Sequence, residues 1–184
     1  MEATAWERAA ILAEVMASAN REPGEARDVL GACAHGGRRA CGARGALVRY
    51  TPHGRATGRA EGTSAALRAL AEQALAWGEG PGDDAARSGR ELADVDLRAP
   101  SARRRWPRWA PRAAHLGFGR VRALPLAERG RPVGALVLFD APDEALSGPV
   151  GVWGRALCRV TAHALSLQRE LRESGPSSPS GTGS

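Results

Sequence analysis

The stretch "GRVRALPLAERGRPVGALVLFD", Gly119 to Asp140, contains two apolar runs separated by the polar residues "ERGR". Two apolar runs joined by a short polar segment with a glycine are typical of a β-hairpin, and Gly130 provides the residue for its tight turn. We therefore predict two antiparallel strands that meet at Gly130. A hairpin among helical segments favours an α+β fold.

The second of these strands is apolar on both of its faces. Alternation along the strand separates two sets of side chains, with Val133, Ala135, Val137 and Phe139 on one face and Leu136 and Leu138 on the other. A strand of this kind lies in a sheet that is covered on both sides. We therefore expect helices or loops to pack against both faces of the sheet.

Segments on either side of the hairpin show helical or strand-like spacing. In the first helix, the stripe of Trp6, Ala9, Ala13 and Met16 is expected to face inward. The glycine-rich segment after Ala34 is expected to end the second helix. The expected helices are 2–19, 25–34, 63–77, 81–86 and about 148–172, with a short helical segment ending at residue 115, and the other expected strands are 46–50, 55–62 and 91–97.

The chain divides into three segments by composition. Residues 1–24 form an N-terminal helix and a linker that contains Pro23 and Gly24, and residues 25–172 form the main domain. Residues 173–184 are rich in serine, glycine and proline and contain no apolar side chain, so we expect a disordered tail.

The composition fits one folded domain, because 43% of the 184 residues are hydrophobic. Cys33, Cys41 and Cys158 have spacings that fit neither a disulfide framework nor a zinc site, which favours a reduced, cytoplasmic protein. The N-terminus lacks the pattern of a signal peptide. The longest strongly apolar run, Val133–Phe139, is far shorter than the ~20 residues of a membrane helix, so we expect no membrane partner.

No catalytic set can be assembled from the sequence. The chain has no lysine, which excludes a Walker-type nucleotide site, and its histidines are too scattered to form a metal-ligand pair on one helix. Four carboxylates are candidates for acid–base chemistry, although no defined pair can be assigned: Asp83, Asp84, Asp94 and Asp96. Cys41 has no assignable base. We therefore expect a protein that is not an enzyme, and the sequence assigns no cofactor.

The charge pattern allows two interpretations. The net charge is +6, all basic residues are arginine, and the stretch "RRRWPRWAP", Arg103 to Pro111, combines arginines with two tryptophans. One interpretation is a nucleic-acid-binding surface in which arginine contacts phosphates and tryptophan contacts bases. The other is a folded segment whose basic side faces water.

Three segments in this order resemble a known family: "EGPGDDAARSGRELADVDL" from Glu79, "RWPRWAPRAAHLGFGRVRALPL" from Arg105, and "RGRPVGALVLF" from Arg129. They resemble the GAF domains of actinobacterial GAF–ANTAR regulators. The resemblance implies a central antiparallel sheet with helices on both faces, and a ligand pocket between the sheet and the loops on one face. It also implies a sensing role and dimerisation through terminal helices.

The chain departs from this family pattern at two points. Gly82 stands where these proteins often have cysteine, and residues 173–184 are too few for the RNA-binding ANTAR output domain. RNA antitermination by this chain is therefore not expected. Some GAF domains reduce free methionine sulfoxide with cysteine thiols, but the three cysteines here match no such site.

We therefore expect a non-enzymatic GAF-type sensor or regulatory domain in signal transduction or transcriptional control, binding a small molecule or a partner protein. A nucleic-acid-binding protein with an arginine-rich face is the alternative. The resemblance implies that Trp106 is buried and that Arg103, Arg104 and Arg105 form a solvated approach to a helix. The residues expected to bind a ligand are Trp77, Asp94, Trp106, Phe118 and Leu124.

The final helix carries a heptad seam, in which apolar residues are spaced by four and three positions. Its members are Trp153, Leu157, Val160, Ala164, Leu167 and Leu171. The seam indicates either a helix packed on its own sheet or a helix that pairs with a second copy of the chain. The arginine-rich segment from Arg98 to Arg131 is also expected to attract an acidic partner protein or an anionic ligand.

Overall fold

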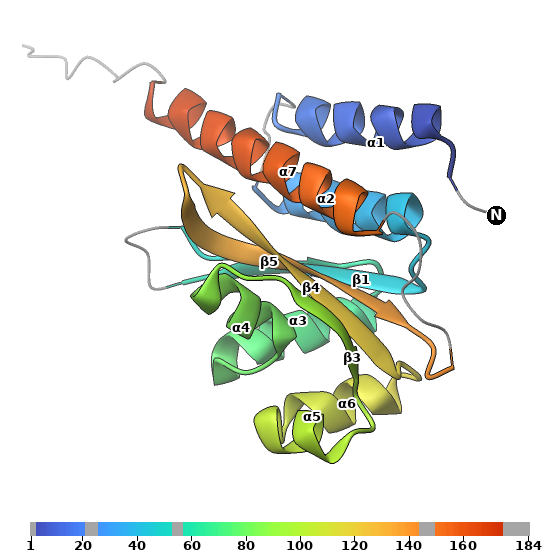
Figure 1. The fold of residues 1–184 in the computed structure, drawn as a ribbon. Coiled ribbons are helices and arrows are strands. Elements are labelled where there is room, and N and C mark those ends of the chain that lie inside the picture. Colours follow the sequence, from blue (N-terminus) through green and yellow to red (C-terminus); the bar gives the residue numbers. More distant parts are fainter. Residues whose placement is uncertain (1–2, 21–25, 53–56, 144–149, 175–184) are drawn as a thin grey trace, which may run out of the picture.

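The computed structural model describes residues 3–20, 26–52, 57–143 and 150–174. It contains a sheet between two layers of helices (Figure 1). In chain order the elements are α1 (Ala5–Ser18), α2 (Ala26–Cys41), β1 (Gly45–Tyr50), β2 (Arg59–Gly62), α3 (Ala65–Trp77), α4 (Pro81–Ser88), β3 (Leu92–Asp96), α5 (Pro100–Arg105), α6 (Trp109–His115), β4 (Arg120–Glu128), β5 (Arg131–Asp140) and α7 (Val150–Glu173).

The sheet has the strand order β2-β1-β5-β4-β3, and every neighbouring pair is antiparallel. The predicted hairpin supplies β4 and β5. Its two-residue turn has positive φ at both Arg129 (49°) and Gly130 (80°), as a type I′ turn requires. The prediction of a hairpin centred on Gly130 is therefore confirmed.

A bulge in the hairpin changes the predicted facing of one residue. Leu126 pairs with Gly134 but Ala127 pairs with Pro132, so Val133 has no residue opposite it. This extra residue reverses the alternation. Val133 consequently packs with Leu136 on the α7 side, and its predicted position on the face of Val137 was wrong.

Helices cover both faces of the sheet, in agreement with the predicted α+β fold. Helices α1, α2 and α7 lie on one face, and α3 to α6 lie on the other (Figure 1). Each layer contains a separate cluster of buried apolar side chains. We call these the upper core, beneath α2 and α7, and the lower core, between the sheet and α3 to α6.

Helix α2 continues past the glycines that were expected to end it. A Cβ atom added at Gly36 would lie 2.6 Å from Ile11 Cγ2, and one at Gly37 would lie 3.1 Å from Leu136. These glycines allow the helix to approach α1 and the sheet closely. The helix ends only at Gly42, which has a φ of 66°.

Helix α1 turns Trp6, Ala9 and Ala13 of the predicted stripe away from the core, and only its fourth member, Met16, packs against the upper core. Thr4 and Glu7 form a capping box at its start, and Ile11 and Val15 are buried in the upper core. Trp6 is 82% exposed. The larger aliphatic side chains occupy the interior because burying them removes more apolar area from water than burying alanines.

Most residues of the α7 heptad seam pack against other parts of the same domain. Leu157 and Ala164 are fully buried in the upper core, and Val160 packs against it. Trp153 and Leu167 are half-buried, and only Leu171 is largely exposed. The central part of the seam therefore matches the interpretation of a helix packed on its own sheet.

Some predicted segments fall outside this description. The proposed linker is largely within residues 21–25, and most of the proposed tail is within residues 175–184, neither of which the structure describes. Within residues 3–20, 26–52, 57–143 and 150–174, no helix combines the length and apolar character needed to cross a membrane.

Candidate functional site

The lower core contains a row of aromatic rings where a pocket was expected. Trp106 and Trp109 meet edge-to-face with ring centroids 5.8 Å apart, and Trp109 stacks on Phe139 at 5.8 Å. Phe118 lies on Phe139 at 4.8 Å. Both tryptophans are only 1% exposed. The domain's own side chains therefore occupy the space between the sheet and α5 and α6.

Three of the predicted ligand-binding residues lie in this lower layer. Trp106 and Phe118 belong to the aromatic row itself. The guanidinium groups of Arg108 and Arg112 lie 5.2 and 4.9 Å from the ring centroid of Trp77, which is at the end of α3. These cation–π contacts connect α3 to α6.

The other two predicted residues are not brought together with them. Asp94 lies on the edge strand β3 and accepts hydrogen bonds from Arg120 at 2.8 and 2.5 Å. Leu124 is fully buried in the upper core, on the opposite side of the sheet from Trp106. The alternation of β4 sends Ala123 to the lower core and Leu124 to the upper core, so the five residues do not line one cavity.

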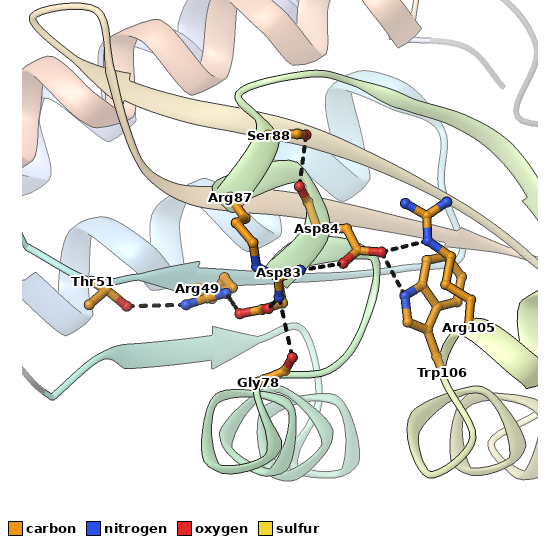
Figure 2. Close-up of polar contacts among 9 residues, drawn as sticks. All are labelled: Arg49, Thr51, Gly78, Asp83, Asp84, Arg87, Ser88, Arg105 and Trp106. Atoms are coloured by element: carbon orange, nitrogen blue, oxygen red, sulfur yellow. Dashed lines mark hydrogen bonds and ion pairs between the residues drawn. The ribbon is translucent and has the colours of Figure 1, made fainter.

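A network of ion pairs lies beside the aromatic row, and Figure 2 shows how its side chains converge on the start of α4. Asp83 pairs with Arg49 from β1 and with Arg87 one turn along α4. The side chains of Arg49 and Asp83 are each only 12% exposed. Arg49 also donates a hydrogen bond to Thr51 Oγ1 at 3.2 Å. Asp83 therefore anchors α4 to the sheet.

The neighbouring carboxylate anchors α4 to α5. Asp84 Oδ2 accepts hydrogen bonds from Arg105 Nε at 2.7 Å and from the indole nitrogen of Trp106 at 2.9 Å. Its Oδ1 accepts one from Arg87 at 3.2 Å. All four oxygens of Asp83 and Asp84 thus have donors, so neither carboxylate is available as a general base in this arrangement.

Two members of this region were not predicted from the sequence. Arg49 is an arginine within a short strand, and nothing in that pattern indicates a buried ion pair. Glu79 accepts hydrogen bonds from the backbone nitrogens of Arg108 and Trp109, both at 2.7 Å, and so satisfies two donors at the start of α6. Because Glu79 lies 30 positions from Trp109, the contact depends on tertiary structure.

Gly82 allows α4 to lie directly against the sheet. A Cβ atom at this position would lie 2.9 Å from Val137 Cγ2 on β5. Any larger residue would require α4 or Val137 to move. Gly82 and the buried Arg49–Asp83 pair together form a closely packed contact between α4 and the sheet.

The arginine-rich stretch does not form a base-stacking surface. Trp106 and Trp109 are buried and are therefore unavailable to stack on bases. Arg105 pairs with Asp84, and Arg108 pairs with Glu79 at 3.1 Å. The nucleic-acid interpretation thus loses the exposed tryptophans on which it depended.

Comparison with known proteins agrees with this geometry. The protein-family model described as "GAF domain" matches residues 25–166. This chain belongs to the GAF domain family. GAF domains are sensor and regulatory domains in signalling, and they are generally non-catalytic. No curated protein matches the sequence of this GAF domain.

Solved structures share the fold of this GAF domain at low sequence identity. The GAF domain of a phosphoenolpyruvate-protein phosphotransferase from Coxiella burnetii is 15% identical, with a TM-score of 0.62 over 93% of this chain and 99% of that one. A methyl-accepting chemotaxis protein fragment is 14% identical, with a TM-score of 0.63 and coverage of 88% and 98%. Free methionine-R-sulfoxide reductase from Neisseria meningitidis, solved with its substrate, is 13% identical, with a TM-score of 0.60 and coverage of 93% and 96%.

The thiols of this GAF domain lie on the α2 and α7 side of the sheet, away from the aromatic row. Cys33 and Cys158 are buried, and Cys41 is half-buried. Burial raises the pKa of Cys33 to about 12 and that of Cys41 to about 11, and it raises the pKa of Cys158 as well. All three are protonated at neutral pH, whereas the thiolate is the nucleophilic form.

Acid is expected to destabilise this GAF domain. The hydrogen bonds from Arg120 lower the pKa of Asp94. Burial raises the pKa of Glu79, but the hydrogen bonds from Trp109 and Arg108 outweigh it and lower the pKa overall. A carboxyl group whose pKa is lower in the folded state stabilises the fold above its unfolded pKa, and this contribution is lost as the pH falls through the folded value.

The free energy of unfolding should therefore decrease as the pH falls below about 4, the usual range of unfolded carboxyl groups. Urea unfolding at pH 6 and at pH 3 measures this loss. The Asp94→Asn variant should show a smaller decrease between the two pH values, because it lacks one of the titrating groups. An equal decrease in the variant would contradict the role given to Asp94.

Proposed function

We propose that this GAF domain is a non-enzymatic regulatory module, of the actinobacterial GAF–ANTAR regulator type, that transmits its signal by protein contact as a homodimer. The packed lower core is the observation that supports it most directly. Trp106, Trp109 and Phe139 fill the layer between sheet and helices, and the adjacent carboxylates are paired with arginine. Small-molecule binding by this domain remains a prediction, although the five predicted residues do not line one cavity.

The outer face of α1 is the surface proposed for contact with the second copy. This face consists of Trp6, Ala9, Ala10, Ala13 and Ala17, all of which are exposed. The opposite face of the helix is buried in the upper core through Ile11 and Val15. A helix that is apolar on both faces is normally covered on both sides.

The spacing on this face fits helix pairing. Trp6, Ala10, Ala13 and Ala17 are separated by four, three and four positions, which is a heptad seam. Small residues along such a seam allow two helices to approach closely. A second copy of α1 offers the same seam, as a two-fold symmetric interface requires.

An arginine on this face should prevent dimerisation. We expect wild-type protein to be dimeric by light scattering at micromolar concentration, and Ala13→Arg to be at least about tenfold weaker in self-association, because the charge would be buried in the interface. Ala69→Arg is the matched control, since Ala69 is an exposed alanine on α3 in the other layer. A wild-type protein that stays monomeric at micromolar concentration, or an unaffected Ala13→Arg dimer, would contradict the proposal.

A further inference from the structure

A cleft lies at the end of the upper layer, where the last turns of α7 and the start of α2 meet the end of β1. Its volume is about 220 Å³. Since about 10–15 Å³ of such volume is enough to hold one water molecule, the cleft has room for a small metabolite. It is on the opposite side of the sheet from the aromatic row and on a different surface from the outer face of α1.

The lining of this cleft combines an apolar floor with basic side chains. Tyr50, Pro52 and Leu165 contribute to the floor and walls. The charged lining residues are three arginines, Arg59, Arg169 and Arg172, and one acid, Glu173. Among the residues that the structure describes, Arg59 is exposed and has no acidic partner. This composition favours a ligand with an anionic group and an apolar body.

A buried chain of hydrogen bonds holds one of these arginines in place. Tyr50 donates to Glu128 Oε1 at 3.0 Å, and Arg169 donates to Glu128 Oε2 at 3.0 Å. The Glu128 side chain is only 5% exposed, while that of Arg169 is 36% exposed. Glu128 therefore fixes the position of Arg169 at the rim of the cleft, and only one of the guanidinium nitrogens is used in this contact.

Gln168 is an unusual member of the lining. The residue is 5% exposed, and within the described part of the chain its amide nitrogen has no hydrogen-bond partner. Leaving a buried donor unsatisfied destabilises the fold. A leucine of similar size would avoid this cost. The nitrogen has almost no accessible surface in this conformation, so it reaches a ligand in the cleft only when the side chain turns.

The geometry points to a second binding site in this GAF domain: the cleft formed by Tyr50, Arg59, Gln168 and Arg169 binds a small organic anion. A carboxylate or phosphate oxygen accepts hydrogen bonds from the two arginines and, once the Gln168 side chain turns toward the cleft, from its amide. The apolar part of the ligand packs against Tyr50 and Leu165. Such a ligand would connect α7 to the start of β2. The inference does not depend on the proposed dimer, because it uses no residue of α1.

Binding can be tested with the complete chain and two probes, sodium phosphate and sodium succinate, by isothermal titration calorimetry at low ionic strength with sodium chloride as the blank. We expect saturable 1:1 binding of at least one probe with a Kd of about 1 mM or tighter. Binding of phosphate alone would assign the site to phosphorylated ligands, and binding of succinate alone would assign it to carboxylic acids. Absence of saturable binding of both probes would overturn the proposal.

Two variants distinguish specific binding in the cleft from nonspecific attraction of an anion to the positively charged protein. Arg59→Ala and Gln168→Leu should each weaken binding by roughly 10-fold or more, the usual effect of losing one hydrogen bond to a charged group. Gln168→Leu should also leave the thermal stability of the unliganded protein unchanged or raised, because it removes an unsatisfied amide. Arg103→Ala is the matched control, since it removes one exposed arginine from α5 in the other layer. Equal weakening by Arg103→Ala and Arg59→Ala would contradict a specific site.

Discussion

Replacement of Trp109 by alanine is expected to lower the free energy of unfolding by about 3–5 kcal/mol, the range found for large aromatic residues in cores. Trp109 is 1% exposed and contacts both Trp106 and Phe139. Its ring also lies against the start of α4, because a Cβ atom at Gly80 would be 3.1 Å from it. The substitution therefore leaves a cavity among the sheet, α4 and α5 that these elements cannot close without moving.

Urea unfolding followed by circular dichroism measures this loss. Trp6→Ala is the matched control, because Trp6 is 82% exposed, and it should change stability by less than about 0.5 kcal/mol. Both variants should be compared at a protein concentration at which the proposed dimer is dissociated. If Trp109→Ala is as stable as Trp6→Ala, the lower layer is not the packed core described above.

Replacement of Asp83 by asparagine is expected to cost about 3 kcal/mol, the effect of removing one partner from a buried ion pair. The variant keeps the shape of the side chain but leaves the Arg49 guanidinium, which is 12% exposed, without its counter-charge. Arg49 Nε is already buried without a hydrogen-bond partner in the described residues, so little else compensates the charge. The contact between α4 and the sheet should weaken.

Glu170→Gln is the control for the loss of a carboxylate. Glu170 pairs with Arg129 on the surface, where the side chains are 52% and 84% exposed, and such pairs contribute about 0–1 kcal/mol. Chemical denaturation of both variants gives the comparison. A double variant, Arg49→Met with Asp83→Leu, should be less destabilised than Asp83→Asn, because it removes both charges together. If the single and double variants lose equal stability, the effect does not come from the unpaired arginine.

The local sequence specified the hairpin and most of the elements. The apolar runs around Gly130 could form only a paired structure with a two-residue turn, and positive φ at that turn favours glycine. The double apolar face of β5 indicated a sheet covered on both sides, which the helical layers confirm. These features depend on residues close together in the chain, so their pattern was sufficient.

Tertiary packing decided the points at which the predictions failed. Glycines normally end a helix, yet Gly36 and Gly37 lie inside α2 because Ile11 and Leu136, from distant segments, occupy the space beside them. The stripe of α1 that contains Trp6 was a plausible inner face by periodicity alone. The stripe that contains Ile11 and Val15 faces the core instead, because burying these larger side chains removes more apolar area from water.

The candidate site depended on tertiary structure more than any other feature. The resemblance drew attention to Trp106, but its partner Asp84 lies 22 positions away, and the residue that binds Asp83, Arg49, lies 34 positions away. Sequence periodicity indicates which face of a helix or strand is apolar, but it does not indicate which helices and strands pack against each other. The sequence therefore determined the strands, the turn and the family, while only the packed structure decided that aromatic rings and ion pairs fill the lower layer, because those contacts join separate elements across the sheet.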